Sequence, residues 1–438
     1  MEGQLCVKFV VWNSMYGILC DHRGPKGRLT YRQGLKEEML IMTGCVPRSW
    51  RPWFLRSGAM LACFLATGAA AQISIDIDET QRISFESGNF DIRRYSGEMQ
   101  GVSYFVDNEL VMTADQIDLE TDGQPDEGSF FVKSLEVINA EITGEDLLFS
   151  SAIARNVDFG VLLGEHSPVR NVSFDAGAAG FFDDSFLQVR GIEFSDESAT
   201  VTVGNVETLD FVFDALPTGE RYARNGGLLI DDLRFDLGTV NREFKELADT
   251  LAARGLRAAE FDFAVSQIAN FVGGELRAEH AFNLVMDEMA SLELVSGFEV
   301  KLATLVALES MAAQGRAKES EMLNLIGGIE LASLNATYLD AGLVDTLVDV
   351  MAAEQNVSPA EMRSSLRSML TQTLEGMLPR NGRRMARPLE TLLKQGGGLE
   401  VSVRPQQPII LSNFLGFLIM PDLALEQLGV TITHLRDQ

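Results

Sequence analysis

The chain has 438 residues and a formal net charge of −27 at pH 7. So acidic a protein is repelled by nucleic acid over most of its area, which argues against a nucleic-acid partner. All four cysteines and all three tryptophans lie before residue 72, so the remainder can form no disulfide, cysteine metal site or thiol nucleophile.

The first interpretable segment is RSGAMLACFLATGAAAQ, residues 56–72. A secretory signal needs a basic stretch, a short apolar run and a small-residue cleavage site. These three parts occur here in that order, as Arg48, Arg51 and Arg56, residues 59–66, and Ala69 to Ala71. We expect cleavage before Gln72 and a periplasmic or extracellular protein in a Gram-negative cell. The alternative of a membrane anchor needs about 20 apolar residues, and this run is shorter; we expect no transmembrane helix in the mature chain.

The segments around this signal have their own interpretation. Residues 1–40 are expected to be an over-extended gene start, and residues 41–71 to hold the signal peptide. Cys63 follows Met60-Leu61-Ala62, so acylation there is an alternative, although only a few apolar residues would precede it. The charge also changes at the boundary, because residues 1–71 hold nine of the 36 Lys and Arg residues but four of the 63 Asp and Glu residues.

Residues 72–235 have the period-two alternation of half-buried strands, as in LEVINAEI, LQVRGIEF and LDFVFD. Few helical patterns separate these strands, whereas parallel pairing needs crossover connections. We therefore expect an α+β fold dominated by β structure: a long, curved, mainly antiparallel sheet with amphipathic helices in the C-terminal half. A parallel β-helix with C-terminal helices is the alternative, because short related phrases such as IARNVDF and PVRNVSF recur.

Helices are predicted in the C-terminal half of the chain. Residues 236–357 are expected to form a region of repeated strands and helices, and residues 358–438 a helical region. One helix is expected after a cap at Thr239 and up to Gly255. Residues 226–256 and 327–357 both run from Gly-Gly through a strand pattern into a helix pattern, which indicates a unit used twice. Ser358, Pro359 and Glu361 form the signature of a capping box. The helix that follows is expected to face a core through its apolar residues, Met362, Leu366, Met369, Leu370 and Met377.

The alternating strand patterns, the signal segment and the helices between strands resemble those of secreted, cysteine-poor Gram-negative envelope proteins of the AsmA-like, lipid-handling type. The resemblance covers residues 80–430 loosely. The resemblance implies a long sheet that cradles acyl chains. It includes no diagnostic motif, so it assigns no functional residue to this chain.

No catalytic motif is found, and no cofactor is predicted apart from calcium at one loop. The mature chain has three histidines, His166, His280 and His434, without the spacing of a zinc site; each is expected at the surface or at a cap. Asp118, Glu120 and Asp122 resemble the start of a calcium loop, but Pro125 and Ser129 break the pattern. The alternative is an acidic hairpin loop with an Asp-Gly turn.

The C-terminal part reverses the charge, because residues 361–404 hold eight Lys and Arg residues against four Glu. The apolar run PIILSNFLGFLIMP, residues 408–421, follows and is too short to span a bilayer. One interpretation is a packed helix pair whose arginines neutralise the acidic sheet. The other is lipid contact, in which arginines meet anionic head groups and the apolar run meets acyl chains. The candidates are Arg383, Arg384, Arg387, Phe414, Leu415, Phe417 and Leu418.

Two functions follow from these observations. The first is a non-enzymatic exported envelope protein that binds lipid or scaffolds the outer membrane through its sheet. The second is a secreted polysaccharide-active enzyme or adhesin on a β-helix. The absence of a catalytic motif and of tryptophan beyond residue 72 favours the first.

Overall fold

The computed structural model describes most of the chain after residue 72. The described ranges are 73–76, 81–91, 93–122, 130–143, 146–159, 180–195, 200–219, 221–239, 245–253, 255–307, 327–413 and 420–436. The predicted signal segment, its cleavage site and Cys63 lie outside these ranges.

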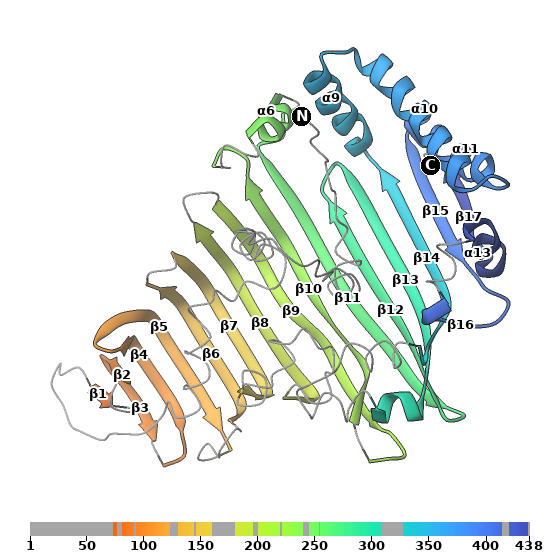
Figure 1. Cartoon of the computed structure of the whole chain (residues 1–438). Coiled ribbons are helices and arrows are strands. Elements are labelled where there is room, and N and C mark those ends of the chain that lie inside the picture. Colours follow the sequence, from red (N-terminus) through yellow and green to blue (C-terminus); the bar gives the residue numbers. More distant parts are fainter. Residues whose placement is uncertain are drawn as a thin grey trace, which may run out of the picture.

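One open sheet dominates the molecule, and each of its described strand pairings is antiparallel (Figure 1). From β4 to β14 the strands lie side by side in chain order. At one end β2 and β3 both pair with β4, and at the other β15 and β16 both pair with β14. The predicted antiparallel sheet is confirmed, and the β-helix alternative is wrong because a β-helix needs parallel pairing.

The strands of the first half of the sheet lengthen along the chain. Their bounds are β1 Ile73–Asp76, β2 Gln81–Phe85, β3 Ser87–Asp91, β4 Ser96–Val106, β5 Glu109–Thr121, β6 Phe131–Ile142, β7 Leu147–Asp158, β8 Phe181–Ser195 and β9 Thr200–Ala215. The remaining strands are β10 Arg221–Asp236, β11 Ala258–Val272, β12 Glu275–Met286, β13 Ala290–Lys301, β14 Ile329–Asp340, β15 Gly397–Val403, β16 Ile409–Ile410 and β17 Thr431–Leu435.

The tightest packing lies at the narrow end of the sheet, over β1 to β6. Its fully buried side chains include Ile75, Phe85, Met99, Val102 and Val132. The buried positions mostly alternate along the strands, which places one face in a core, but in β4 the alternation shifts by one residue between Met99 and Val102, where Gly101 has a φ of 61°. From β9 onward most apolar side chains are only half-buried, and this part of the sheet contains the surface considered below.

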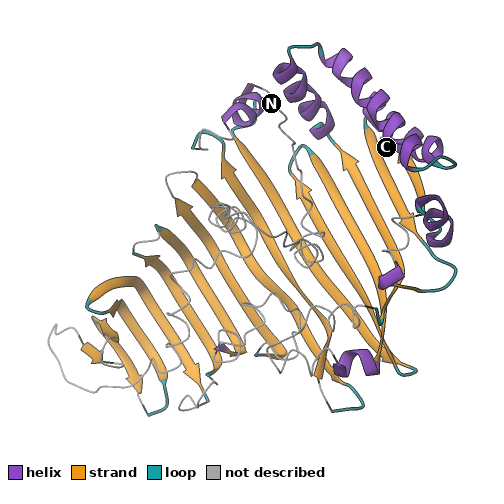
Figure 2. Ribbon diagram, viewed as in Figure 1, coloured by secondary structure: helices purple, strands orange, loops and turns teal. Residues whose placement is uncertain are grey.

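A helical segment over residues 302–307 follows β13 at the lower ends of the strands, and the other helices lie toward the wide end of the sheet (Figure 2). They are α6 Lys245–Ala253, α9 Leu343–Gln355, α10 Pro359–Met377, α11 Gly382–Gln395, the short 3-10 helix η4 Leu411–Asn413, and α13 Pro421–Leu428. The capping box is confirmed: the Ser358 side chain accepts from the Glu361 amide, and the Glu361 carboxylate accepts from the Ser358 amide at 2.9 Å. The Thr239 cap cannot be assigned, because residues 240–244 lie outside the described ranges.

The prediction for the apolar side of α10 is partly wrong. Met362 is buried, and Leu366 packs beside it against Val348 and Ala352 of α9. Met369 and Met377, however, are 59% and 61% exposed. Although α10 contacts both α9 and α11, these two methionine side chains stay largely exposed.

The predicted strand-and-helix unit does occur twice. β10 leads to α6 and β14 leads to α9, and β11 to β13 lie between them. Since neighbouring strands alternate in direction, β10 and β14 run the same way, and both helices lie at the same end of the sheet (Figure 1). Ala248 and Leu251 are buried in α6, and Val348 and Ala352 in α9.

Candidate binding surface

One face of β10 to β14, called the apolar face here, is built from alternate positions of each strand. The register places Phe261, Met286 and Ala290 side by side, and each step of two residues along the strands gives the next row. The remaining members of the face are Leu228, Ile230, Leu233, Phe235, Phe263, Val265, Gln267, Ala269, Phe271, Leu276, Ala278, His280, Phe282, Leu284, Leu292, Leu294, Ser296, Phe298, Val300, Ile329, Leu331, Leu334, Ala336, Tyr338 and Asp340. Apart from Asp340 at the end of β14, these positions hold no Asp, Glu, Lys or Arg.

The opposite face of the same strands is charged. Ion pairs cross it from strand to strand, at 2.9 Å between Arg234 and Glu260 and at 3.0 Å between Lys301 and Glu330. The other charged side chains on this face are Asp232, Asp236, Asp262, Glu275, Arg277, Glu279, Glu293 and Glu299. The sheet therefore has one almost uncharged face and one predominantly acidic face. Strand alternation produces the separation, together with one register shift in β10, between Ile230 and Leu233, and one in β14, between Leu331 and Leu334.

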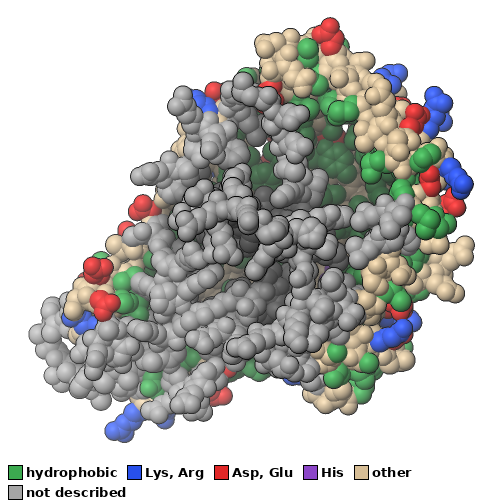
Figure 3. Space-filling model, in the orientation of Figure 1, with side chains coloured by type: hydrophobic (Ala, Val, Ile, Leu, Met, Phe, Trp, Pro, Cys, Tyr) green, Lys and Arg blue, Asp and Glu red, His purple; other side chains and the backbone are tan. Residues whose placement is uncertain are grey.

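Aromatic rings line the apolar face. Phe263 and Phe282 meet edge to face with ring centroids 5.2 Å apart, and Phe235 and Phe261 do so at 5.9 Å. All four side chains are half-buried. In Figure 3 hydrophobic side chains gather in a hollow below the helices, over the adjoining ends of β12 to β14.

Among the described elements, α13 packs on this face at the β14 and β15 side. Its Ala424 and Leu428 form a buried cluster with Leu331 and Val403. Partly buried side chains, Phe298 and Leu334 among them, surround that cluster. The α13 contact thus bounds the apolar face on one side, and α6 and α9 stand at its end (Figure 1).

A polar row crosses the middle of the apolar face. Gln267 of β11 lies opposite His280 of β12, and His280 lies opposite Ser296 of β13. Burial lowers the pKa of His280, and its ring meets that of Phe298 with centroids 5.8 Å apart. His280 therefore lies half-buried within β12, on the apolar face. His434 does act as a cap, with Nε2 2.7 Å from the carbonyl oxygen of Gly396 at the end of α11; His166 lies outside the described residues.

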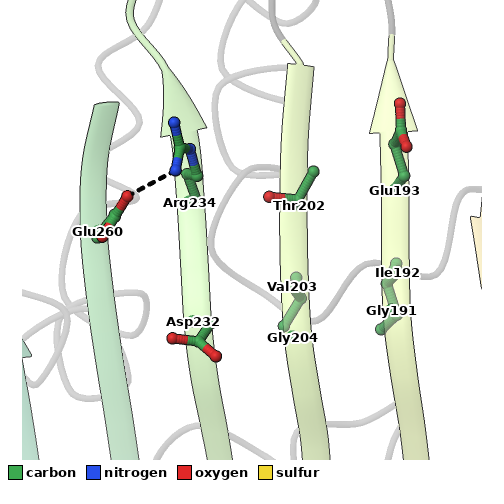
Figure 4. Close-up of a pocket in the computed structure, with 9 residues that line it drawn as sticks. All are labelled: Gly191, Ile192, Glu193, Thr202, Val203, Gly204, Asp232, Arg234 and Glu260. Atoms are coloured by element: carbon green, nitrogen blue, oxygen red, sulfur yellow. Dashed lines mark hydrogen bonds and ion pairs between the residues drawn. The ribbon is translucent and has the colours of Figure 1, made fainter. Parts of the chain in front are cut away.

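One pocket lies on the charged face, across β8 to β11 (Figure 4). It has a volume of about 370 Å³ and is lined by a cross-strand row of Glu193, Thr202, Arg234 and Glu260. The Arg234 guanidinium is already paired with Glu260. Nowhere in the described ranges do three or more His, Cys, Asp or Glu side chains group in a way that could hold a metal ion.

The three residues proposed for calcium do not form one group. Asp118 and Glu120 lie exposed on one face of β5, and the Asp122 carboxylate is paired with the Lys133 ammonium at 2.5 Å. This hydrogen bond and the charge of Asp122 raise the pKa of Lys133. Residues 123–129, which include Pro125 and Ser129, lie outside the described ranges, so calcium binding at this loop stays a prediction.

The three arginine candidates share one exposed side of α11. Arg383, Arg384 and Arg387 are all exposed, whereas Met385 and Ala386 between them are buried. Of the three, Arg383 has a described ion pair, 3.8 Å from Glu375. The apolar candidates Phe414, Leu415, Phe417 and Leu418 lie outside the described ranges.

Exposed apolar side chains occur on the two helices that adjoin α11 or the turn before it. Met377 ends α10, and Met420 and Leu423 belong to the start of α13; their exposed fractions are 61%, 56% and 42%. The Asp422 carboxylate accepts hydrogen bonds from the backbone amides of Arg380 and Asn381, so the start of α13 is fixed to the turn between α10 and α11. We call Met377, Met420, Leu423 and the three arginines the basic corner.

Comparison with known proteins gives little about function. A family model described as "Uncharacterized protein" matches residues 283–435, which contain β13, β14 and the C-terminal helices. No curated protein matches the chain. None of the described helices has the length and hydropathy needed to cross a membrane.

Proposed function

We propose that this protein binds the acyl chains of lipid on the apolar face of β10 to β14, as a non-enzymatic component of the cell envelope. The observation that carries the proposal is the almost uncharged face itself, which extends over five neighbouring strands and whose side chains are mostly half-buried. A contiguous apolar surface of this kind is usually a binding surface in a soluble protein.

Hydrocarbon suits this surface better than a peptide does. Each strand from β10 to β14 is hydrogen-bonded to a neighbour on both sides, so the face offers no free backbone donors or acceptors to pair with an added strand. An acyl chain needs no such partners. Its burial against Phe263, Phe282 and Leu284 would be stabilised by about 0.8 kcal/mol for each methylene group.

The basic corner supports a second part of the proposal, that the protein docks on an anionic lipid surface. Most of the chain is acidic and would be repelled by such a surface. At the corner, Arg383, Arg384 and Arg387 are exposed, and exposed methionine and leucine side chains occur on the adjoining helices, the combination that interfacial helices use. The corner belongs to the same end of the protein as the helices around the apolar face (Figure 1).

The signal-like segment of residues 56–72 supports an envelope location, and export is part of this proposal. The mature protein should begin at Gln72 or within a few residues of it. N-terminal sequencing after cell fractionation tests this, and an uncleaved cytoplasmic protein would contradict it. The second function, a polysaccharide-active enzyme or adhesin, was tied to a β-helix, and the antiparallel sheet removes that support.

Native mass spectrometry of the protein purified from its own cells tests lipid binding. We expect adducts with the masses of phospholipids, which dissociate as intact lipids on collisional activation. A protein that carries no lipid, and that also takes up none when incubated with phospholipid vesicles, would contradict the proposal.

A further inference from the structure

The polar row Gln267, His280 and Ser296 is unexpected in a face that otherwise avoids polar side chains. The three residues come from three consecutive strands and are direct cross-strand partners. Gln267 uses its amide nitrogen to donate to the carbonyl oxygen of Ala223 at 2.9 Å, which leaves its side-chain oxygen available. The row therefore brings an acceptor, an imidazole and a hydroxyl together.

Across the described ranges, neither His280 nor Ser296 makes a hydrogen bond to another residue. Ser296 is 9% exposed, and desolvation lowers the pKa of His280. Neither side chain has an atom among the fully buried, unpaired polar atoms of the described residues, so a molecule bound on the apolar face can reach both groups and supply their hydrogen bonds.

The position of the row fits one end of an acyl chain. Between the polar row and the end of the sheet where α6 and α9 lie, three further cross-strand rows are apolar. Their members on β12 are Phe282, Leu284 and Met286. At about 3.4 Å per residue these rows cover about 20 Å, somewhat more than the roughly 15 Å of hydrocarbon in one leaflet of a bilayer. On the other side two apolar rows follow, those of Ala278 and Leu276.

We propose that this row binds the uncharged carbonyl or hydroxyl groups at the glycerol-ester end of a membrane lipid, while the acyl chain extends from it toward the helix end. This inference rests on the proposed function and adds the lipid class. An ionised fatty acid fits less well, because His280 is neutral near pH 7. A carboxylate would also need a cationic partner beside the row. The flanking positions on the same face are apolar: Val265 and Ala269 on β11, and Leu294 and Phe298 on β13.

Paired lipids test the inference. Ester-linked phosphatidylglycerol and its ether-linked analogue with the same chain length differ in the two carbonyl groups. We expect the full-length protein to bind the ester form about three- to tenfold more tightly, the ratio that one neutral hydrogen bond supplies. Ser296→Ala and His280→Phe should each reduce the ratio of the affinities for the ester and the ether form.

The control variant is Ser291→Ala, on the same strand but on the opposite face, and thermal melts verify that each variant is folded. Equal binding of the two lipids by the parent protein, or a preference that both row variants retain, would overturn the inference while the proposed function stands. Binding of neither lipid would overturn both.

Discussion

The carboxylate of Asp422 holds Asn381 by two hydrogen bonds, one to the backbone amide and one to the side-chain amide, each 3.1 Å long. Desolvation is the largest single influence on the pKa of Asp422 and raises it, but these hydrogen bonds and that from the Arg380 amide together lower it below its usual value. This carboxylate connects α13 to the turn between α10 and α11, and so assembles the basic corner.

Replacing Asp422 should therefore loosen the corner. In Asp422→Ala we expect faster hydrogen exchange at the amides of Arg380 and Asn381, because both lose their acceptor. Exchange in β12 should not change. Glu426→Ala, also on α13 and exposed, is the control. Equal exchange in the Asp422 and Glu426 variants would show that Asp422 does not fix the turn.

Reversing the charge of the basic corner should weaken membrane docking. The variant with Arg383, Arg384 and Arg387 all changed to Glu should sediment less with vesicles that contain phosphatidylglycerol, and the difference should shrink as salt is raised. A variant with the same total charge change elsewhere, at the exposed Arg93, Arg94 and Arg224, separates local contact from net charge. If both variants lose binding equally, the corner is not the docking site.

Phe282 should contribute to folding even before ligand binds. Phe282→Ala is expected to lower the free energy of unfolding in urea by about 1–3 kcal/mol, less than for a fully buried ring because this side chain is half-buried. A double-mutant cycle with Phe263 should give a coupling of about 0.5–1.5 kcal/mol for their edge-to-face contact. Asn283→Ala, exposed on the opposite face, should change stability by less than about 0.5 kcal/mol. A larger loss at Asn283 than at Phe282 would contradict the assignment of faces.

His280 should make stability depend on pH in the acidic range. Its pKa in the folded protein is lowered by burial from the ordinary value of 6.5, so below about pH 6.5 the unfolded chain binds the proton more strongly. The stability associated with the neutral imidazole is then present above that pH and is lost as the pH falls toward the folded-state pKa. Urea unfolding between pH 7 and pH 5 should show a smaller decline for His280→Phe than for the parent. Identical declines would refute this assignment.

Much of the fold was predictable because its signals are local. The alternation in LEVINAEI lies within one strand, β6, and the Ser358 and Glu361 capping box lies within one helical turn. What each helix faces is not local: Met369 and Met377 fit the apolar pattern of α10, yet both stay largely exposed. The candidate binding surface was missed for the same reason. His280 looked isolated in the sequence, since only the register of three strands brings it between Gln267 and Ser296.

Site-specific photo-cross-linking on the two faces of one strand tests lipid binding most directly. A benzophenone amino acid would replace Phe263, on the apolar face of β11, or Ile268, which is 55% exposed on the opposite face. After irradiation with phospholipid vesicles, mass spectrometry should find covalent lipid at position 263 and little at position 268. Equal labelling at the two positions, or labelling at 268 alone, would contradict the assignment of the apolar face of β10 to β14 as the lipid-binding surface.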